Sequence, residues 1–135
     1  MNRIWERLWI GGLADAEKLA EANPHGITTV VSLSDIPVGV KRRGVNYLRL
    51  PVNDDEPVPV GQFDRILDAL SENIRWGTVL VNCAQGVSLA PVLAAAYMDA
   101  VGYKNVDAAL KEIRQVRPFV SPSHTLLNSL KENLR

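Results

Sequence analysis

The sequence contains only one cysteine and two histidines among its 135 residues. A single cysteine cannot form an internal disulfide, and with two distant histidines it falls short of the ligand spacing of a zinc site. Cys83 is therefore either a structural residue or a reactive thiol. We expect no metal and no cofactor.

An excess of charge of either sign is also missing. Fifteen Lys and Arg balance fifteen Asp and Glu, so no global field draws the protein to nucleic acid or to an anionic membrane. The longest apolar stretches, such as Leu89 to Met98, are much shorter than the roughly 20 residues that cross a bilayer. The first residues lack the basic, apolar and small-residue order of a secretory signal. We therefore expect a cytoplasmic monomer without nucleic-acid or membrane partners.

The overall amino-acid composition is that of a globular protein. Apolar residues make up 47% of the chain and charged residues 22%, which is typical of a folded domain. A chain of this length can bury one continuous core. We predict a single domain over residues 1–135, without internal repeats.

Apolar runs alternate with segments of helical period. This is the pattern of βαβ units, which build a mostly parallel sheet with helices on both faces. The expected strands cover residues 8–10, 27–33, 45–51 and 78–81, and the expected helices cover 14–22, 60–74, 88–101, 106–116 and 125–134. Asn105 is expected to cap the fourth helix, and Ser121 or Ser123 the fifth.

Cys83 lies between a predicted strand and a predicted helix. Residues 79–91 have the pattern of a strand, a tight loop and a helix start, with Cys83 at the carboxyl end of the strand, where α/β folds place ligands. Backbone N–H groups of such a loop turn inward next to a helix N-terminus, which forms a nest for an anion and stabilises a thiolate. An unreactive buried cysteine is the alternative. The predicted anion-binding loop consists of Ala84, Gln85, Gly86, Val87 and Ser88.

This segment resembles the signature of the protein tyrosine and dual-specificity phosphatase superfamily: His-Cys, five residues, then Arg and Ser or Thr, followed in the dual-specificity branch by Pro. Cys83, Gly86, Ser88 and Pro91 match it in register. The resemblance covers nearly the whole chain, because four further segments are similar to family segments: 7–12, 26–33, 47–54 and 117–118. It implies a phosphatase II-like, three-layer α/β sandwich with a mostly parallel, four- to five-stranded central sheet flanked by helices.

The resemblance also implies an activity and the residues that perform it. In the family, phosphate monoesters are hydrolysed through a phosphocysteine intermediate, which makes Cys83 the nucleophile. The general acid is an aspartate after the third strand, and the register places Asp54 there, with Asp55 as the second choice; a solvated acidic turn is the alternative interpretation. A small anion or a phosphorylated peptide is the partner implied at the loop.

Three signature positions depart from the family pattern. Asn82 replaces the His, Leu89 replaces the Arg, and Ala90 replaces the Ser or Thr. Arginine's planar fork binds two phosphoryl oxygens and stabilises their charge in the transition state, so its loss costs on the order of 3 kcal/mol, or at least roughly a hundredfold in rate. In the family the His orients the loop and the hydroxyl stabilises the leaving thiolate. We predict an inactive or very weak phosphatase.

Changes confined to catalytic positions indicate either a natural pseudophosphatase or deliberate engineering. We favour an engineered variant, because a drifting natural relative would also lose Cys83 or Asp54. One alternative function is a non-catalytic phospho-binding or interaction module. Another is a repurposed cysteine hydrolase that attacks activated neutral esters through Cys83 with His124 as base. In the family the segment before the last helix lies near the cysteine loop, although a solvent-facing histidine is the simpler interpretation of His124.

Overall fold

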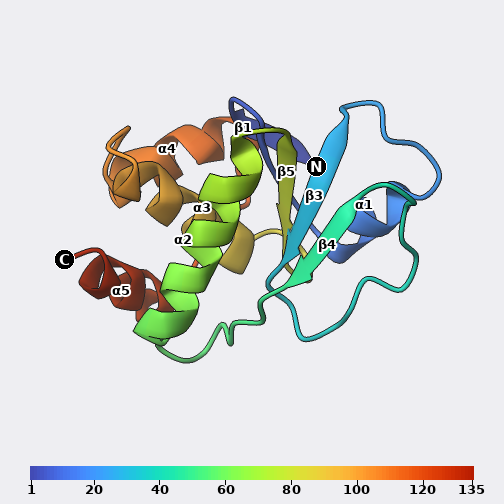
Figure 1. Ribbon diagram of the computed structural model, residues 1–135. Helices are drawn as coiled ribbons and strands as arrows, with labels where there is room; N and C mark the ends of the chain where they lie inside the picture. Colours follow the sequence, from blue (N-terminus) through green and yellow to red (C-terminus); the bar gives the residue numbers. More distant parts are fainter.

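The computed structural model describes residues 1–135 and contains one five-stranded sheet, with the strand order β1-β2-β5-β3-β4 (Figure 1). β1 pairs antiparallel with β2, and the other three pairings are parallel. The mostly parallel sheet predicted from the sequence is confirmed. The strand bounds are Asn2–Trp5 (β1), Leu8–Gly11 (β2), Ile27–Ser32 (β3), Asn46–Arg49 (β4) and Thr78–Asn82 (β5).

β5 occupies the centre of the sheet because its side chains suit burial on both faces. Val79, Leu80 and Val81 have no exposed surface, and the strand carries no charged residue. β2 and β3 pair with it on either side. A strand without charges is what a sheet covered by helices on both faces requires at its centre.

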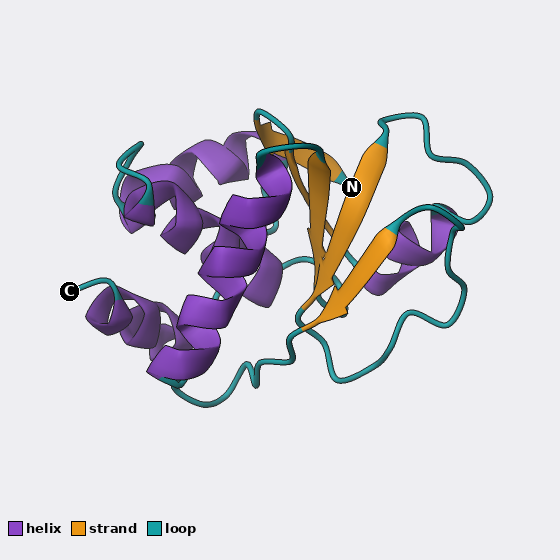
Figure 2. Cartoon of the chain, in the orientation of Figure 1, coloured by secondary structure: helices purple, strands orange, loops and turns teal.

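The helices form two layers of unequal size. The short helix α1 lies on one face of the sheet, and the other helices lie on the opposite face (Figure 1 and Figure 2). A cluster of six buried residues lies under α1, and a cluster of 29 lies between the sheet and the other helices. The helix bounds are Leu13–Lys18 (α1), Val60–Ile74 (α2), Leu89–Ala100 (α3), Val106–Val116 (α4) and His124–Asn133 (α5).

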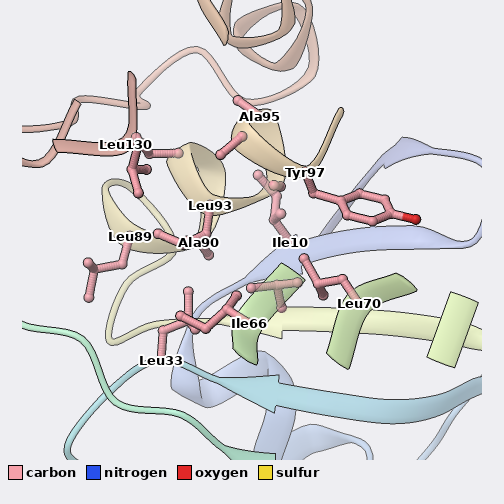
Figure 3. Packing of buried hydrophobic residues seen from close by; sticks show 14 of the residues in the cluster. Ile10, Leu33, Ile66, Leu70, Leu89, Ala90, Leu93, Ala95, Tyr97 and Leu130 are labelled. Carbon is pink, nitrogen blue, oxygen red and sulfur yellow. The ribbon is translucent and has the colours of Figure 1, made fainter. Parts of the chain in front are cut away.

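α3 is the central helix of the thicker layer. Every residue from Leu89 to Met98 is buried, and a helix that is apolar all round belongs inside a core. Figure 3 shows side chains of this helix within the core, including Leu89 and Ala90 from its first turn. Because α3 follows the Cys83 loop directly, its packing fixes one end of that loop.

Three differences from the sequence-based expectation are larger than one residue. β1 was not predicted; it lies at one edge of the sheet, paired only with β2. α1 ends at Lys18 instead of residue 22, because the next N–H groups, of Ala20 and Glu21, bond to carbonyls three residues back, which tightens the chain into a turn. β4 covers 46–49 of the expected 45–51.

The predicted helix caps are present at both later helices. The Asn105 side chain accepts a hydrogen bond from the N–H of Ala108 at 2.9 Å. Between the two serines considered for α5, the structure selects Ser123, whose Oγ accepts from the N–H of Leu126 at 3.1 Å. Both helices therefore begin where the capping residues predicted.

None of the five helices combines the length and the apolar character that a membrane-spanning helix requires.

Candidate active site

Cys83 directly follows β5 and is only 4% exposed. Neighbouring strand ends hold it: its N–H donates to the carbonyl of Gly11 at 3.3 Å, and the N–H of Leu33 donates to the carbonyl of Asn82 at 2.8 Å. The cysteine therefore lies where the carboxyl ends of β2, β5 and β3 meet, which is the ligand-binding end of such a sheet.

The loop after Cys83 turns backbone N–H groups toward the sulfur. The N–H groups of Gly86 and Ala90 donate to Cys83 Sγ at 3.2 and 3.4 Å. Two such donors stabilise a negative charge on sulfur relative to the neutral thiol. The role of nucleophile for Cys83 stays a prediction.

Hydrogen bonds from outside the loop explain this orientation. The four carbonyls from Ala84 to Val87 accept, in turn, from Leu13 N, Arg117 Nη2, Arg117 Nε and Ser121 N. In a planar trans peptide the carbonyl and the following N–H point in opposite directions. Carbonyls bound to the scaffold therefore turn the N–H groups of residues 85–88 to the inner side. Anion binding by this loop stays a prediction.

Gly86 makes the tight loop sterically allowed. Its φ of +72° lies in the left-handed region that glycine enters without cost. A Cβ atom at this position would lie 2.6 Å from the carbonyl carbon of Gly11 and 2.7 Å from Nη2 of Arg117. No side chain fits between the loop and the scaffold behind it.

Arg117 supports the loop from behind. It follows α4 and is 7% exposed. Its Nε donates to the carbonyl of Gly86 at 2.9 Å and its Nη2 to that of Gln85 at 3.1 Å, while the guanidinium lies 4.8 Å from the centre of the Phe119 ring. The sequence shows an arginine before a proline, but its burial behind a loop 31 residues away is visible only in three dimensions.

Asp15 is a second charged group on this side of the loop. Its carboxylate accepts from the N–H of Gly12 at 2.9 Å and from the ammonium of Met1 at 3.0 Å. Burial raises the pKa of Asp15, but the Gly12 bond, the ammonium and the charge of Arg117 together outweigh it and hold the pKa below its ordinary value.

Of the two predicted acid positions, Asp54 and Asp55, the structure brings Asp54 to the cavity of Cys83. Asp54 and Cys83 both line it, and Oδ1 of Asp54 accepts from the Ser88 hydroxyl at 2.6 Å. The Ser123 hydroxyl donates to the backbone carbonyl of Asp54 at 3.0 Å, which holds the acidic loop against the start of α5. Asp55 is exposed and lies outside the cavity lining. The role of general acid for Asp54 remains a prediction.

The cavity over Cys83 has a volume of about 430 Å³. Its walls contain two carboxylates, Asp35 and Asp54, and no lysine, arginine or histidine. Four of the five residues of the predicted anion-binding loop contribute to it; Gly86 does not. The twelve lining residues are Ser34, Asp35, Ile36, Val52, Asn53, Asp54, Cys83, Ala84, Gln85, Val87, Ser88 and Leu89.

The three altered signature positions lie immediately before Cys83 and at the start of α3, where the loop ends. Leu89 begins α3, lines the cavity and belongs to the core, with 8% of its surface exposed. Ala90 is fully buried, and its N–H is one of the two donors to Cys83 Sγ. Asn82 is fully buried; its Oδ1 accepts from the Ser32 hydroxyl at 2.7 Å, and its Nδ2 has no hydrogen-bond partner.

His124 does not reach the cavity. It is the first residue of α5, its side chain is exposed, and it is absent from the cavity lining. His25 lies elsewhere, stacked on Trp9 with 4.1 Å between the ring centres. The solvent-facing interpretation of His124 describes its position, and its role as a base stays a prediction without a contact to support it.

Comparison with known proteins agrees with this geometry. The family model of the dual specificity phosphatase catalytic domain matches residues 8–135. A probable dual specificity protein phosphatase of Dictyostelium discoideum is 26% identical over 130 residues, which are 96% of this chain and 60% of that protein. Human dual specificity protein phosphatase 22 is 28% identical over 134 residues, 98% of this chain and 72% of that protein.

A solved structure shows the same fold. The crystal structure of human DUSP28 superimposes with a TM-score of 0.85 at 26% identity, covering 99% of this chain and 95% of that one. Because this chain spans only 60% of the Dictyostelium protein, the likeness concerns the domain and not the whole of such a relative. The Cys83 loop at the end of β5, the sheet order and the match over residues 8–135 lead to one conclusion: this chain belongs to the dual specificity phosphatase family.

Proposed function

We propose that this chain is an inactive member of its family, which does not hydrolyse phosphate monoesters at enzymatic rates. The observation that carries the proposal is the absence of any cationic side chain from the cavity over Cys83, where Leu89 occupies the signature arginine position. A phosphate monoester carries a charge of about −1.5 to −2 at pH 7. Asp35 and Asp54 repel that charge, and no side chain of the cavity compensates for it.

Arg117 does not replace the missing arginine. Its guanidinium is bonded to the carbonyl oxygens of Gln85 and Gly86 and is nearly fully buried behind the loop. It does not line the cavity. To reach a phosphoryl group it would have to release both carbonyls, and a buried acceptor left without a donor costs about 1–3 kcal/mol.

The phospho-binding module is supported less well. The loop N–H groups still offer donors to an anion, but in the family the arginine supplies binding as well as catalysis. Leu89 supplies no positive charge, and the acidic residues Asp35 and Asp54 line the cavity. Electrostatic repulsion therefore disfavours the binding of a dianion as well as its hydrolysis.

A second candidate is thiol-dependent hydrolysis of activated neutral esters. It is favoured by the two N–H donors on Cys83 Sγ and by the apolar side chains of Ile36, Val52, Val87 and Leu89 in the cavity walls. The sulfur attacks the carbonyl carbon, the alkoxide leaves and takes a proton from water, and a second water cleaves the thioester to return the thiol and the acid. Inward-facing N–H groups stabilise the oxyanion that forms in each step.

The engineered origin inferred from the sequence belongs to this proposal. Its support is that three signature positions depart from the family pattern while Cys83 and Asp54 still line one cavity. A genome that encodes the same chain would contradict it.

The test compares an aryl phosphate with the matching aryl ester, using the protein and its Cys83→Ala variant. We expect no difference between the two proteins on the phosphate. Turnover of the phosphate at 1 s⁻¹ or faster, in the range of about 1–10³ s⁻¹ typical of enzymes, and its loss in Cys83→Ala would contradict the proposal.

The ester arm of the same test decides the second candidate. Ester turnover that disappears in Cys83→Ala supports it, and equal turnover in both proteins rejects it. The variant His124→Gln addresses the base: unchanged ester turnover would reject the role that the sequence suggested for His124.

A further inference from the structure

The cavity over Cys83 has two ends of opposite polarity. At its base, backbone N–H groups face the sulfur and present positive partial charge. Two acidic residues, Asp35 and Asp54, line its walls, and the Asp54 carboxylate is held there by the Ser88 hydroxyl. A ligand that satisfies both ends must carry an electronegative atom near Cys83 and a positive group farther out.

Neither carboxylate is neutralised by the protein. The three ion pairs of the structure involve other residues. Arg49 approaches Asp35 but donates to its backbone carbonyl and forms no ion pair with its carboxylate. The carboxylate of Asp54 accepts only from the neutral Ser88 hydroxyl. Both negative charges are therefore available to a ligand.

The rest of the lining is suited to a small organic group. Ile36 is 56% exposed and lies at the outer part of the cavity wall. Leu89 and Val52 are buried, and each contributes apolar surface that a carbon-rich ligand can cover. Binding pockets for small molecules commonly combine such walls with a few convergent polar groups.

We propose that this cavity selects positively charged electrophiles, with esters and thioesters that bear an ammonium group as the chemical class. The carbonyl oxygen lies on the loop N–H groups and the ammonium beside Asp54 and Asp35. This inference rests on the proposed function in one respect: both depend on a cavity without a cationic side chain. An arginine at position 89 would neutralise the negative charge of one of the two carboxylates.

The single cysteine allows the charge preference to be measured directly. Methanethiosulfonate reagents transfer a small group to a thiolate: the sulfur of Cys83 forms a disulfide and methanesulfinate leaves. One reagent carries a trimethylammonium group and the other a sulfonate, and their rates are followed by mass spectrometry. The rate with the cationic reagent is divided by the rate with the anionic reagent. Dividing this ratio by the same ratio for the urea-unfolded chain removes the difference in intrinsic reactivity between the two reagents.

We expect the cationic reagent to be favoured by about tenfold or more in the folded protein, since two charges about 4 Å apart interact by roughly 1 kcal/mol even in bulk water and by more inside a protein. Salt lowers the preference by screening. Asp54→Asn and Asp35→Asn keep the shape of the side chain and remove its charge, so each variant lowers the ratio. Asp64→Asn, an exposed position on α2 outside the cavity lining, makes the same change of net charge and leaves the ratio unaltered.

A ratio equal to that of the unfolded chain, a preference for the anionic reagent, or a folded protein that reacts with neither reagent overturns the inference. The same holds if Asp64→Asn lowers the ratio as much as Asp54→Asn. These outcomes are independent of the phosphatase test. A protein that hydrolyses aryl phosphate through Cys83 refutes the proposed function, and one that shows no charge preference refutes only this inference.

Discussion

Replacing Leu89 by arginine restores the group whose absence defines this site. Leu89 lines the cavity at the start of α3, next to the loop that holds Cys83. A guanidinium there adds two parallel donors for phosphoryl oxygens in the transition state. The loss of such a preorganised donor costs about 3 kcal/mol, so we expect Leu89→Arg to raise aryl phosphate turnover by roughly a hundredfold over the unaltered chain.

The same substitution lowers stability. Leu89 is 92% buried, as its 8% exposure implies, and burial of a leucine side chain contributes about 1.5–3 kcal/mol. Arginine keeps part of this through its apolar stem. We expect Leu89→Arg to lower the free energy of unfolding by about 1–2 kcal/mol and the melting temperature by several degrees, while the protein remains folded.

The assay measures phosphate turnover and thermal unfolding of Leu89→Arg, with Leu89→Lys and Leu89→Gln as controls. Lysine supplies a charge without the planar fork, so its gain is smaller, and glutamine supplies neither charge nor fork. Addition of Asn82→His and Ala90→Ser should increase the turnover of Leu89→Arg further. If the folded triple variant gains no Cys83-dependent phosphatase activity, the reasoning about the missing arginine is wrong.

Three further predictions concern the scaffold behind the loop. Gly86→Ala forces a Cβ to within 2.7 Å of Gly11 and Arg117 at a positive φ, and should lower the free energy of unfolding by at least about 1–3 kcal/mol; urea unfolding measures this, and a neutral effect contradicts it. Arg117→Leu leaves two loop carbonyls without donors and should cost about 3 kcal/mol or more, with Arg117→Lys recovering part of it; equal stability of all three proteins argues against a positioning role. Asp15 has a depressed pKa in the folded protein, so its contribution to stability is present above its ordinary pKa of 3.8 and is lost as the pH falls through the folded value. Urea unfolding at pH 7 and pH 3 should therefore show Asp15→Asn destabilising the protein more at pH 7, and an equal effect at both pH values would contradict this.

Local patterns in the sequence account for most of the fold. The charge-free run of Val79 to Val81 predicts a central buried strand, and the helical spacing from Val60 to Ile74 predicts α2 with the bounds found. These predictions succeed because periodicity and capping depend on neighbouring residues. β1 was missed because Asn2–Trp5 is short and is stabilised by pairing with β2 rather than by any pattern of its own.

Some features of the candidate site could likewise be predicted from the sequence, and others could not. The predicted nucleophile, Cys83, and the missing arginine at Leu89 follow from the resemblance of this short segment to the family signature. The burial of Arg117 and the exposure of His124 do not, since both depend on how α4 and α5 pack around the loop.

By itself, the sequence determined the order of strands and helices from β2 onward, the position of Cys83 at a strand end and the absence of the signature arginine. All three are properties of residues close together along the chain. Only the tertiary structure decided that Asp54 rather than Asp55 shares the cavity, that Arg117 supports the loop and that two uncompensated carboxylates line the cavity. Each of these results from contacts between distant segments, which are selected by the packing of the whole core.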